Sequence, residues 1–295
     1  IATTRGERSR SLLNRLMPTI LGHLAVGNSP DDQFAAFAQF TETLPASVQI
    51  FSLLDHNRQL TKLLCDMLVL SPRMASYLRR SPALFDLVLF DDFFEPLPNA
   101  VILAKQMQAT TADLSVEEAL DAIKRRAREW RFQCEVQALS HILHPADLGQ
   151  ALSMIADVVV RAVHQLAIQD MQRRHGSIDG QSAILALGRL STGALTAHSD
   201  LDLVVVFQAG TNAQSTGDRA LGSQAYFTRL TQTFVNWLSR PTAEGSLYEV
   251  DMRLRPDGDK GGIAVGIQRF TEYYKKDAWT WEKLALVKAR VVTDP

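Results

Sequence analysis

The chain has 295 residues, of which 46% are hydrophobic, and its formal net charge is -1. This length suits two domains, or one large one, with apolar cores. With a net charge so close to zero, nothing in the overall composition points to nucleic acid or an anionic membrane as a partner.

The composition also bears on the compartment. Two cysteines, Cys65 and Cys134, lie far apart in helical patterns, which predicts buried free thiols in a reducing environment. No apolar run reaches the roughly 20 residues of a membrane span, and no signal peptide is visible. We therefore expect a cytoplasmic protein with no membrane and no nucleic acid among its partners. The chain starts at Ile1 and ends in "VVTDP", so we expect a fragment of a longer protein.

The first half of the chain has the signals of successive helices. Ser71 and Ser81 are each followed by proline, the pairing typical of an N-cap and a first helical residue. Ser115 and Glu118 form a capping-box pattern that predicts a helix running to about Ile142. The basic run within that helix, "KRRAREWR", predicts a solvated face, with nucleic-acid binding as the alternative.

After Pro145 the pattern changes from helices alone to alternating helices and strands. An apolar stripe at helical spacing predicts a helix up to His175, where Gly176 ends it. The later elements are expected in this order: a strand at 182–187, a turn at 188–199, a strand at 200–207, a helix at 221–238, a strand at 246–255 and a helix at 267–292. The sequence thus predicts an α+β protein, with a helical region at 1–150 and a second domain with a small mixed sheet at 151–295.

Three carboxylates stand out in the second domain. Asp200 and Asp202 enter an apolar strand and point to the same face, because side chains alternate along a strand. Alternation in the later strand puts Asp251, Arg253 and Arg255 on one face. If the two strands are neighbours, the three carboxylates converge and repel one another unless a hard cation neutralises them. Mg²⁺ prefers such oxygens together with substrate phosphates, and the arginines would offer forks to a polyphosphate.

The turn before the carboxylates fits this chemistry. It runs through Gly188 and the small residues Ser191 and Thr192, and backbone N–H groups at such a turn can hold phosphate oxygens. Each feature also has an ordinary explanation: a lone D-x-D is commonly a cap or a surface pair, and Gly188 could simply end a strand. The conjunction indicates metal-dependent phosphoryl or nucleotidyl transfer.

Two further residues have alternative interpretations. Trp281 is expected to pack in the core rather than to stack on an adenine, because large aromatic side chains usually anchor helices. Lys260 lies in a glycine-rich loop, where it could reach a phosphate or be an ordinary surface lysine.

Three stretches resemble a known family. "GRLSTGALTAHSDLDLVVVF", "PTAEGSLYEVDMRLRPDG" and "DAWTWEKLALVKARVV" are similar to the glutamine synthetase adenylyltransferase/adenylyl-removing enzyme family, and the similarity extends back to about Leu44. The resemblance implies a DNA polymerase β-like nucleotidyltransferase fold with attached helical bundles. In this family one half adds AMP from ATP to a tyrosine of glutamine synthetase, and the other half removes it by phosphorolysis. "SDLDL", "GSLYEVD" and "AWTWE" look more like the adenylylating half.

The resemblance also implies roles for individual residues. Asp200, Asp202 and Asp251 would bind Mg²⁺, and Asp251 would deprotonate the tyrosyl hydroxyl. The residues expected to hold the nucleotide are Gly188, Arg189, Ser191, Thr192, Arg253 and Arg255. The family further implies glutamine synthetase and a PII signal protein as partners.

The turn departs from the family pattern Gly-Lys-Leu-Gly-Gly/Ser-Arg-Glu. Arg189 keeps the charge of the usual lysine, but Ser191 replaces a glycine that lets the backbone approach phosphate closely. Gly193 and Ala194 replace an arginine and a glutamate. Two alternatives to the adenylylating domain therefore stay open: the de-adenylylating half, or a weakened module that binds a nucleotide or regulator without chemistry.

Overall fold

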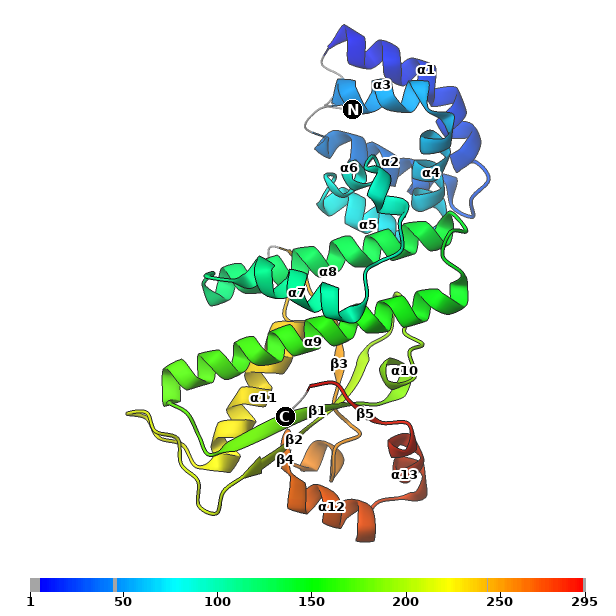
Figure 1. Ribbon diagram of the computed structural model, residues 1–295. Coiled ribbons are helices and arrows are strands. Elements are labelled where there is room, and N and C mark those ends of the chain that lie inside the picture. Colours follow the sequence, from blue (N-terminus) through cyan, green and yellow to red (C-terminus); the bar gives the residue numbers. More distant parts are fainter. Residues whose placement is uncertain (1–5, 45–46, 243, 294–295) are drawn as a thin grey trace. The chain divides into compact units, whose positions relative to one another are not determined.

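A computed structural model describes residues 6–44, 47–242 and 244–293. These residues form two compact units (Figure 1). The first unit comprises the chain up to Pro96 together with Phe132–His144, and the second comprises Leu97–Arg131 together with the chain from Pro145 onward. The expected domain boundary near residue 150 remains a prediction. Helices combined with a small mixed sheet confirm the α+β class.

The first unit is helical throughout its described residues. Its elements are α1 (Glu7–Leu24), α2 (Pro30–Thr43), α3 (Ser47–His56), α4 (Arg58–Leu70), α5 (Pro72–Arg80), α6 (Leu84–Leu87), the 3₁₀ helix η2 (Asp91–Phe94) and the C-terminal end of α8 (Val116–Leu139). One apolar cluster holds these helices together, with fully buried Phe37, Phe51 and Phe85 among its members.

The predicted helix starts have mixed outcomes. The Ser71 side chain accepts a hydrogen bond from the backbone N–H of Met74 at 3.2 Å, which confirms it as the N-cap of α5. Ser81 does not cap a helix, because the chain makes a turn first and α6 begins only at Leu84. The capping box at Ser115 is confirmed, since its N–H donates to the Glu118 carboxylate at 3.0 Å.

The second unit contains the sheet and the helices around it. Its elements are α7 (Ala100–Thr111), the first part of α8, α9 (Pro145–His175), β1 (Gly180–Ala186), α10 (Gly188–Ser191), β2 (Leu201–Ala209), α11 (Ser223–Ser239), β3 (Val250–Asp251), the 3₁₀ helix η3 (Gly258–Lys260), β4 (Ala264–Gly266), α12 (Ile267–Lys276), α13 (Thr280–Val287) and β5 (Arg290–Val291).

The described strands form one mixed sheet around β2. The strand order is β3-β2-β1-β5. Strand β4 pairs with residues 205–207 of β2, after the two residues of β2 that pair with β3. β1 is antiparallel to β2 and to β5, whereas β3 and β4 run parallel to β2. Strand β2 is therefore paired on both sides, which explains its nearly continuous run of buried apolar residues.

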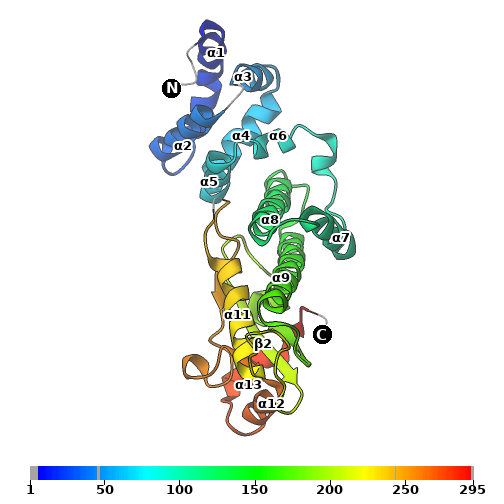
Figure 2. The same ribbon diagram turned by 90° about the vertical axis from the view of Figure 1, so that its left-hand side faces the viewer.

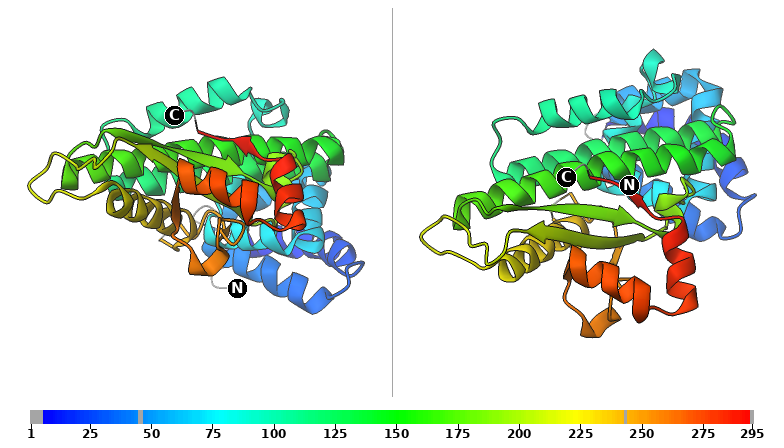
Figure 3. Two further views of the ribbon diagram at one scale, coloured as in Figure 1. Left: turned by 90° about the horizontal axis from the view of Figure 1, so that it is seen from below. Right: turned by 60° about the horizontal axis from the view of Figure 1, so that its bottom comes forward.

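Helices cover both faces of the sheet. On one face, Phe207 of β2 packs with Met171 of α9 and Phe227 of α11, and Figure 2 shows α9 and α11 side by side. On the other face, Val204 of β2 lies in a cluster with Phe270 of α12 and Ala285 of α13. Figure 3 shows α12 and α13 on the side of the sheet opposite α9. Because side chains alternate along β2, Asp202 faces the same side as Val204, toward α12 and α13.

Helix α9 is the one described helix long and apolar enough to cross a membrane, with a mean hydropathy of 1.5 over its most apolar window. This differs from the expectation that no such run exists. More than half of that window is buried inside the protein, as in the core helix of a globular domain. Its contacts with α7 and α11 account for the apolar composition.

Two predicted elements are wrong in extent. The strand expected at 246–255 is reduced to Val250–Asp251, because the chain turns immediately afterwards and the Arg255 N–H donates to the Met252 carbonyl at 3.2 Å. Arg253 and Arg255 are therefore not on a strand. The single helix expected at 267–292 is instead α12, α13 and the strand β5.

Candidate active site

Two of the predicted carboxylates lie opposite each other at one edge of the sheet. Asp202 of β2 is the register partner of Asp251 of β3, and the two strands are parallel. Neighbouring strands are about 4.8 Å apart, and register partners point to the same face. The Leu201 N–H donates to the Glu249 carbonyl at 2.9 Å, which ties the two strands together beside the pair. Asp200 directly precedes β2, so the sequence prediction of neighbouring strands is confirmed.

The carboxylates influence one another electrostatically. Burial raises the pKa of Asp202, and the negative charges of Asp200 and Asp251 raise it further. The pKa of Asp251 is lowered, chiefly because its carboxylate accepts a side-chain hydrogen bond from Arg253. The Arg253 Nε lies 2.8 Å from Asp251 Oδ2, and its backbone N–H also donates to Asp251. A bound cation would offset the repulsion that Asp202 experiences from its two acidic neighbours.

The fit of these residues to a divalent ion is incomplete in the structure. The donors are of the right type, because Mg²⁺ prefers carboxylate oxygens. Among the residues that the structure describes, however, no three carboxylate, imidazole or thiolate groups are arranged so that they could hold a metal ion. The Asp251 carboxylate is paired with Arg253 instead. Asp251 must exchange this arginine for an ion before it can serve as a third ligand.

The predicted glycine turn lies directly against the carboxylates. Gly188 has a φ of +55°, a conformation that favours glycine, and a Cβ atom there would overlap the Asp202 carboxylate. The Leu187 N–H donates to the Asp202 carbonyl at 2.9 Å. The hydroxyls of Ser191 and Thr192 donate to the Gly188 carbonyl at 2.9 and 3.3 Å. Glycine is therefore required at 188 by its closeness to Asp202 as well as by its backbone angle.

The three arginines expected at the nucleotide have different environments. Arg189 is exposed beside Gly188. Arg253 is 76% exposed and holds Asp251. Arg255 is largely buried, where it donates to the Met252 carbonyl at 2.8 Å and lies 3.5 Å from Asp259. Arg189 and Arg253 are thus free to reach solvent near the carboxylates, whereas Arg255 mainly holds the turn after β3.

An open hollow of about 710 Å³ adjoins Arg253. Trp279 and Trp281 line it and are 72% and 57% exposed, so the prediction that Trp281 packs in the core is wrong. The remaining lining residues are Asp257, Gly258, Asp259, Lys260, Tyr273 and Glu282. Glu282 is buried, and it accepts hydrogen bonds from the Tyr273 hydroxyl at 2.8 Å and from the Trp279 backbone at 2.7 Å. This arrangement fixes the start of α13 and leaves both indole rings in solvent.

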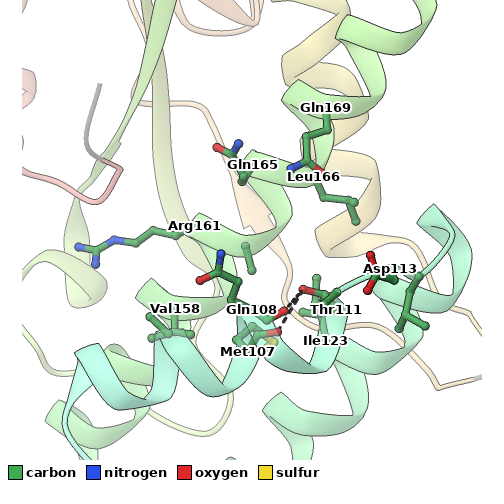
Figure 4. Close-up of a pocket in the computed structure, with 14 residues that line it drawn as sticks. Met107, Gln108, Thr111, Asp113, Ile123, Val158, Arg161, Gln165, Leu166 and Gln169 are labelled. Carbon is green, nitrogen blue, oxygen red and sulfur yellow. Dashed lines mark hydrogen bonds between the residues drawn. The ribbon is translucent and has the colours of Figure 1, made fainter.

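A second cavity, of about 570 Å³, lies between α7, α8 and α9 (Figure 4). Met107, Ile123 and Val158 contribute its apolar lining, and glutamines from α7 and α9 contribute polar groups. The Thr111 hydroxyl lies 3.1 Å from the Met107 carbonyl, so it is satisfied within α7. None of the predicted site residues lines this cavity.

The sequence interpretation missed a row of buried cations on α8. Lys124, Arg128 and Arg131 are 3%, 9% and 5% exposed, so the prediction of a solvated face is wrong for them. Arg125 and Arg126 of the same run are more exposed, as predicted. The buried three recur at i, i+4 and i+7, which places them on one helix face. That spacing was the signal in the sequence that could have indicated a buried face, because basic residues in a solvated run need not recur at helical spacing.

Comparison with known proteins identifies the family. The family model described as glutamate-ammonia ligase adenylyltransferase matches residues 61–295. The bifunctional glutamine synthetase adenylyltransferase/adenylyl-removing enzyme of Brucella suis is 38% identical over 292 residues, covering 98% of this chain and 30% of that protein. The enzymes of the same name from Mesorhizobium japonicum and Caulobacter vibrioides are 37% and 35% identical, covering 98% and 99% of this chain and 30% and 29% of their own lengths.

The chain thus spans about 30% of the length of these relatives, while the similarity covers nearly all of the chain. The residues that the family model matches include Asp200, Asp202 and Asp251, the Gly188 turn, and Trp279 and Trp281. On these grounds the chain belongs to the glutamate-ammonia ligase adenylyltransferase family.

Proposed function

We propose that this chain is an adenylylating domain that transfers AMP from ATP to a tyrosine of glutamine synthetase with the help of Mg²⁺. One observation carries the proposal: Asp202 and Asp251 are register partners on parallel strands, with Asp200 directly before the first of them. The names of the relatives, which act on glutamine synthetase, supply the substrate. The raised pKa of Asp202 supports a cation at this edge.

We also propose that the second unit has the DNA polymerase β-like nucleotidyltransferase fold. The supporting features are the position of the D-x-D pair at the start of β2, the glycine turn that joins β1 to β2, and a third aspartate on a neighbouring strand. The helices on both faces leave this end of β2 and β3 as the edge at which a nucleotide would bind.

In this mechanism the tyrosyl oxygen of the substrate attacks the α-phosphorus of ATP, a bond forms between them, and diphosphate leaves. The ordinary pKa of tyrosine is about 10, so the hydroxyl needs a base at neutral pH. Asp251 takes that proton once Arg253 releases its carboxylate, because the present ion pair makes it a weaker base. A bound Mg²⁺ would neutralise charge on the phosphates. Asp200, Asp202 and Asp251 would hold it.

Arg253 changes partner in this scheme. Its guanidinium is mostly exposed, so it can swing to the departing diphosphate, and the Asp251 carboxylate, which is only 14% exposed, is then left for a cation to neutralise. The Gly188 turn lies against the Asp202 carboxylate, and the exposed Arg189 adds a positive charge beside it. Backbone N–H groups at such a turn can hold phosphate oxygens. Positioning and charge neutralisation would then supply most of the catalysis.

The structure gives a specific reason to keep the module without chemistry as a second candidate. Asp251 is held by Arg253, and the described residues include no ready metal centre. The de-adenylylating half uses the same carboxylates and differs in its substrates. A PII signal protein remains a predicted regulatory partner.

Transfer assays with two substrate pairs test the proposal. The purified chain is incubated with labelled ATP, Mg²⁺ and unmodified glutamine synthetase, or with inorganic phosphate, Mg²⁺ and adenylylated glutamine synthetase. We expect label on glutamine synthetase in the first reaction only, and its loss in Asp251→Asn. ADP formed in the second reaction only would identify the de-adenylylating half. ATP binding by calorimetry without either reaction would identify the module.

A further inference from the structure

The buried cations of α8 contact two loops that lead to the candidate carboxylates. Helix α8 is divided between the two units, and Arg131 is the last of its residues in the second unit. The Arg131 side chain donates hydrogen bonds to the segments before β2 and before β3. Such a side chain can set the distance between the segments, because a guanidinium has several donors in a rigid planar fork.

Two hydrogen bonds of Arg131 reach these segments. One terminal nitrogen donates to the Ala197 carbonyl at 3.1 Å, and the other donates to the Leu247 carbonyl at 3.2 Å. The guanidinium carbon also lies 4.8 Å from the ring centre of Tyr248. Ala197 is three residues before Asp200, and Leu247 is four residues before Asp251. A single side chain therefore links both carboxylate-bearing segments.

Among the residues that the structure describes, the direct pairing between the two segments is short. The turn before β2 is closed locally, since the Thr196 N–H donates to Ser199 Oγ at 3.0 Å. The pairing of β3 with β2 covers only two residues of each strand. Arg131 acts from outside this short pairing, on the loops that approach it. Its burial strengthens these hydrogen bonds and makes their loss costly.

Lys124, on the same face of α8, provides a natural comparison. Its ammonium group donates to the Arg240 carbonyl at 2.9 Å, to the Gly245 carbonyl at 3.1 Å and to Thr242 Oγ1 at 3.3 Å. Those residues belong only to the loop between α11 and β3. Lys124 is as deeply buried as Arg131, and its pKa is lowered by that burial. It therefore stabilises one loop, whereas Arg131 joins two.

We infer that Arg131 is a positioning residue, which holds the Asp200–Asp202 segment and the Asp251 segment at the separation that nucleotidyl transfer requires. The expected effect of Arg131 on catalysis rests on the proposed function. Arg131 does not touch the reacting atoms. A displacement of about 1 Å in a catalytic group is enough to lower a rate by about 10²-fold.

Kinetics of Arg131→Gln, Arg131→Lys and the matched control Lys124→Met test this role. We expect Arg131→Gln to lower kcat for AMP transfer by about 10²-fold, with the KM for ATP changed by less than about 3-fold. Lys124→Met should lose stability but keep kcat within about 3-fold of the wild type. Arg131→Lys retains the charge and should fold, yet one ammonium cannot reproduce the fork, so its kcat should also fall. If both Arg131 variants keep the wild-type kcat, or if Lys124→Met loses as much activity, the inference is wrong.

Hydrogen exchange gives a readout that does not depend on activity. In Arg131→Gln, amides in both 196–202 and 246–251 should exchange faster, and in Lys124→Met only those in 240–248 should do so. Faster exchange in a single segment of Arg131→Gln would overturn the link between the two. If the wild-type chain transfers no AMP, the proposed function fails, and the exchange measurement alone decides whether Arg131 couples the segments.

Discussion

The two units of the chain bury different kinds of side chain. In the first unit the core is apolar and its buried polar groups are mostly neutral, as with Thr61, whose hydroxyl donates to the Leu54 carbonyl at 2.8 Å. The second unit buries Lys124, Arg128 and Arg131 against loops. Regular helices satisfy their own carbonyl groups, but the long loops around β2 and β3 do not, so they need donors from elsewhere. Among the described residues, the buried lysine and arginines therefore lie in the unit with the candidate site, whereas the first unit buries the Glu135 carboxylate beside Arg73.

The largest expected effect is on Asp202, to which the proposed function gives a chemical role rather than a role in folding. Asp202→Asn should reduce AMP transfer by about 10³-fold or more, because under the proposed function it removes an ion ligand and a negative charge from the edge where Asp202 and Asp251 lie. The same change should not lower the unfolding temperature, since burial and its two neighbours already disfavour the charged form of Asp202. Transfer assays and thermal unfolding check both parts. Asp218→Asn, at an exposed position, is the control, and retention of a tenth of the activity by Asp202→Asn would contradict the prediction.

The next effect tests the apolar core of the first unit. Phe85 is fully buried and packs edge-to-face on Phe40 with ring centres 5.7 Å apart. Phe85→Ala should lower the free energy of unfolding by about 3–5 kcal/mol through lost transfer energy and a residual cavity. Phe90 is 60% exposed, so Phe90→Ala should change it by less than about 0.5 kcal/mol. Urea denaturation measures both, and equal losses would show that burial does not distinguish these two phenylalanines.

The free energy of unfolding of the second unit should depend on pH through His164, which belongs to that unit. Burial lowers the pKa of His164 to about 4, and its Nε2 lies 3.0 Å from Ser182 Oγ. The unfolded chain takes up this proton near pH 6.5 and the folded one only near pH 4. The contribution to stability is therefore complete above pH 6.5 and is lost as the pH falls toward 4, by about 3 kcal/mol in all.

Denaturation of wild type and His164→Gln between pH 4 and 7 checks this dependence. The variant should lose most of the slope, whereas His198→Gln, at an exposed position, should keep it. An unchanged slope in His164→Gln would mean that other groups cause the acid sensitivity.

The smallest effect concerns the turn against the carboxylates. Gly188→Ala should lower AMP transfer by about 10-fold and destabilise the second unit by about 1–2 kcal/mol, because the new Cβ meets Asp202 and the backbone angle is unfavourable. Gly222→Ala is a matched control, since a Cβ there meets nothing within 4 Å. Full activity in Gly188→Ala would show that the closeness of the turn to Asp202 is unimportant.

The elements predicted correctly are those whose signals are local. The capping box at Ser115, the stripe of α9 and the apolar run of β2 each depend on a single segment, and each element formed where the pattern indicated. The free thiols are also confirmed, as Cys65 and Cys134 are buried and unpaired, and burial raises their pKa values to about 11 and about 12. The convergence of Asp202 and Asp251 followed from alternation plus the assumption that their strands are neighbours.

The errors arise where distant contacts decide the outcome. Alternation through Arg255 suggested a longer β3, but only two residues of β2 pair with it before the chain turns. The helix expected at 267–292 breaks because the Glu282 carboxylate caps a new helix at Trp279, a contact that no periodicity shows. Charges were expected in solvent, yet α8 buries three of them against loop carbonyls more than a hundred residues away.

A crystal structure with Mn²⁺ and a non-hydrolysable ATP analogue tests the central claim most directly, because the anomalous signal locates the ion. We expect Mn²⁺ bound by Asp200 and Asp202, with Asp251 released from Arg253 to join them and the phosphates lying against the Gly188 turn. Nucleotide bound elsewhere, or no ion at this edge with Asp251 still paired to Arg253, would contradict it.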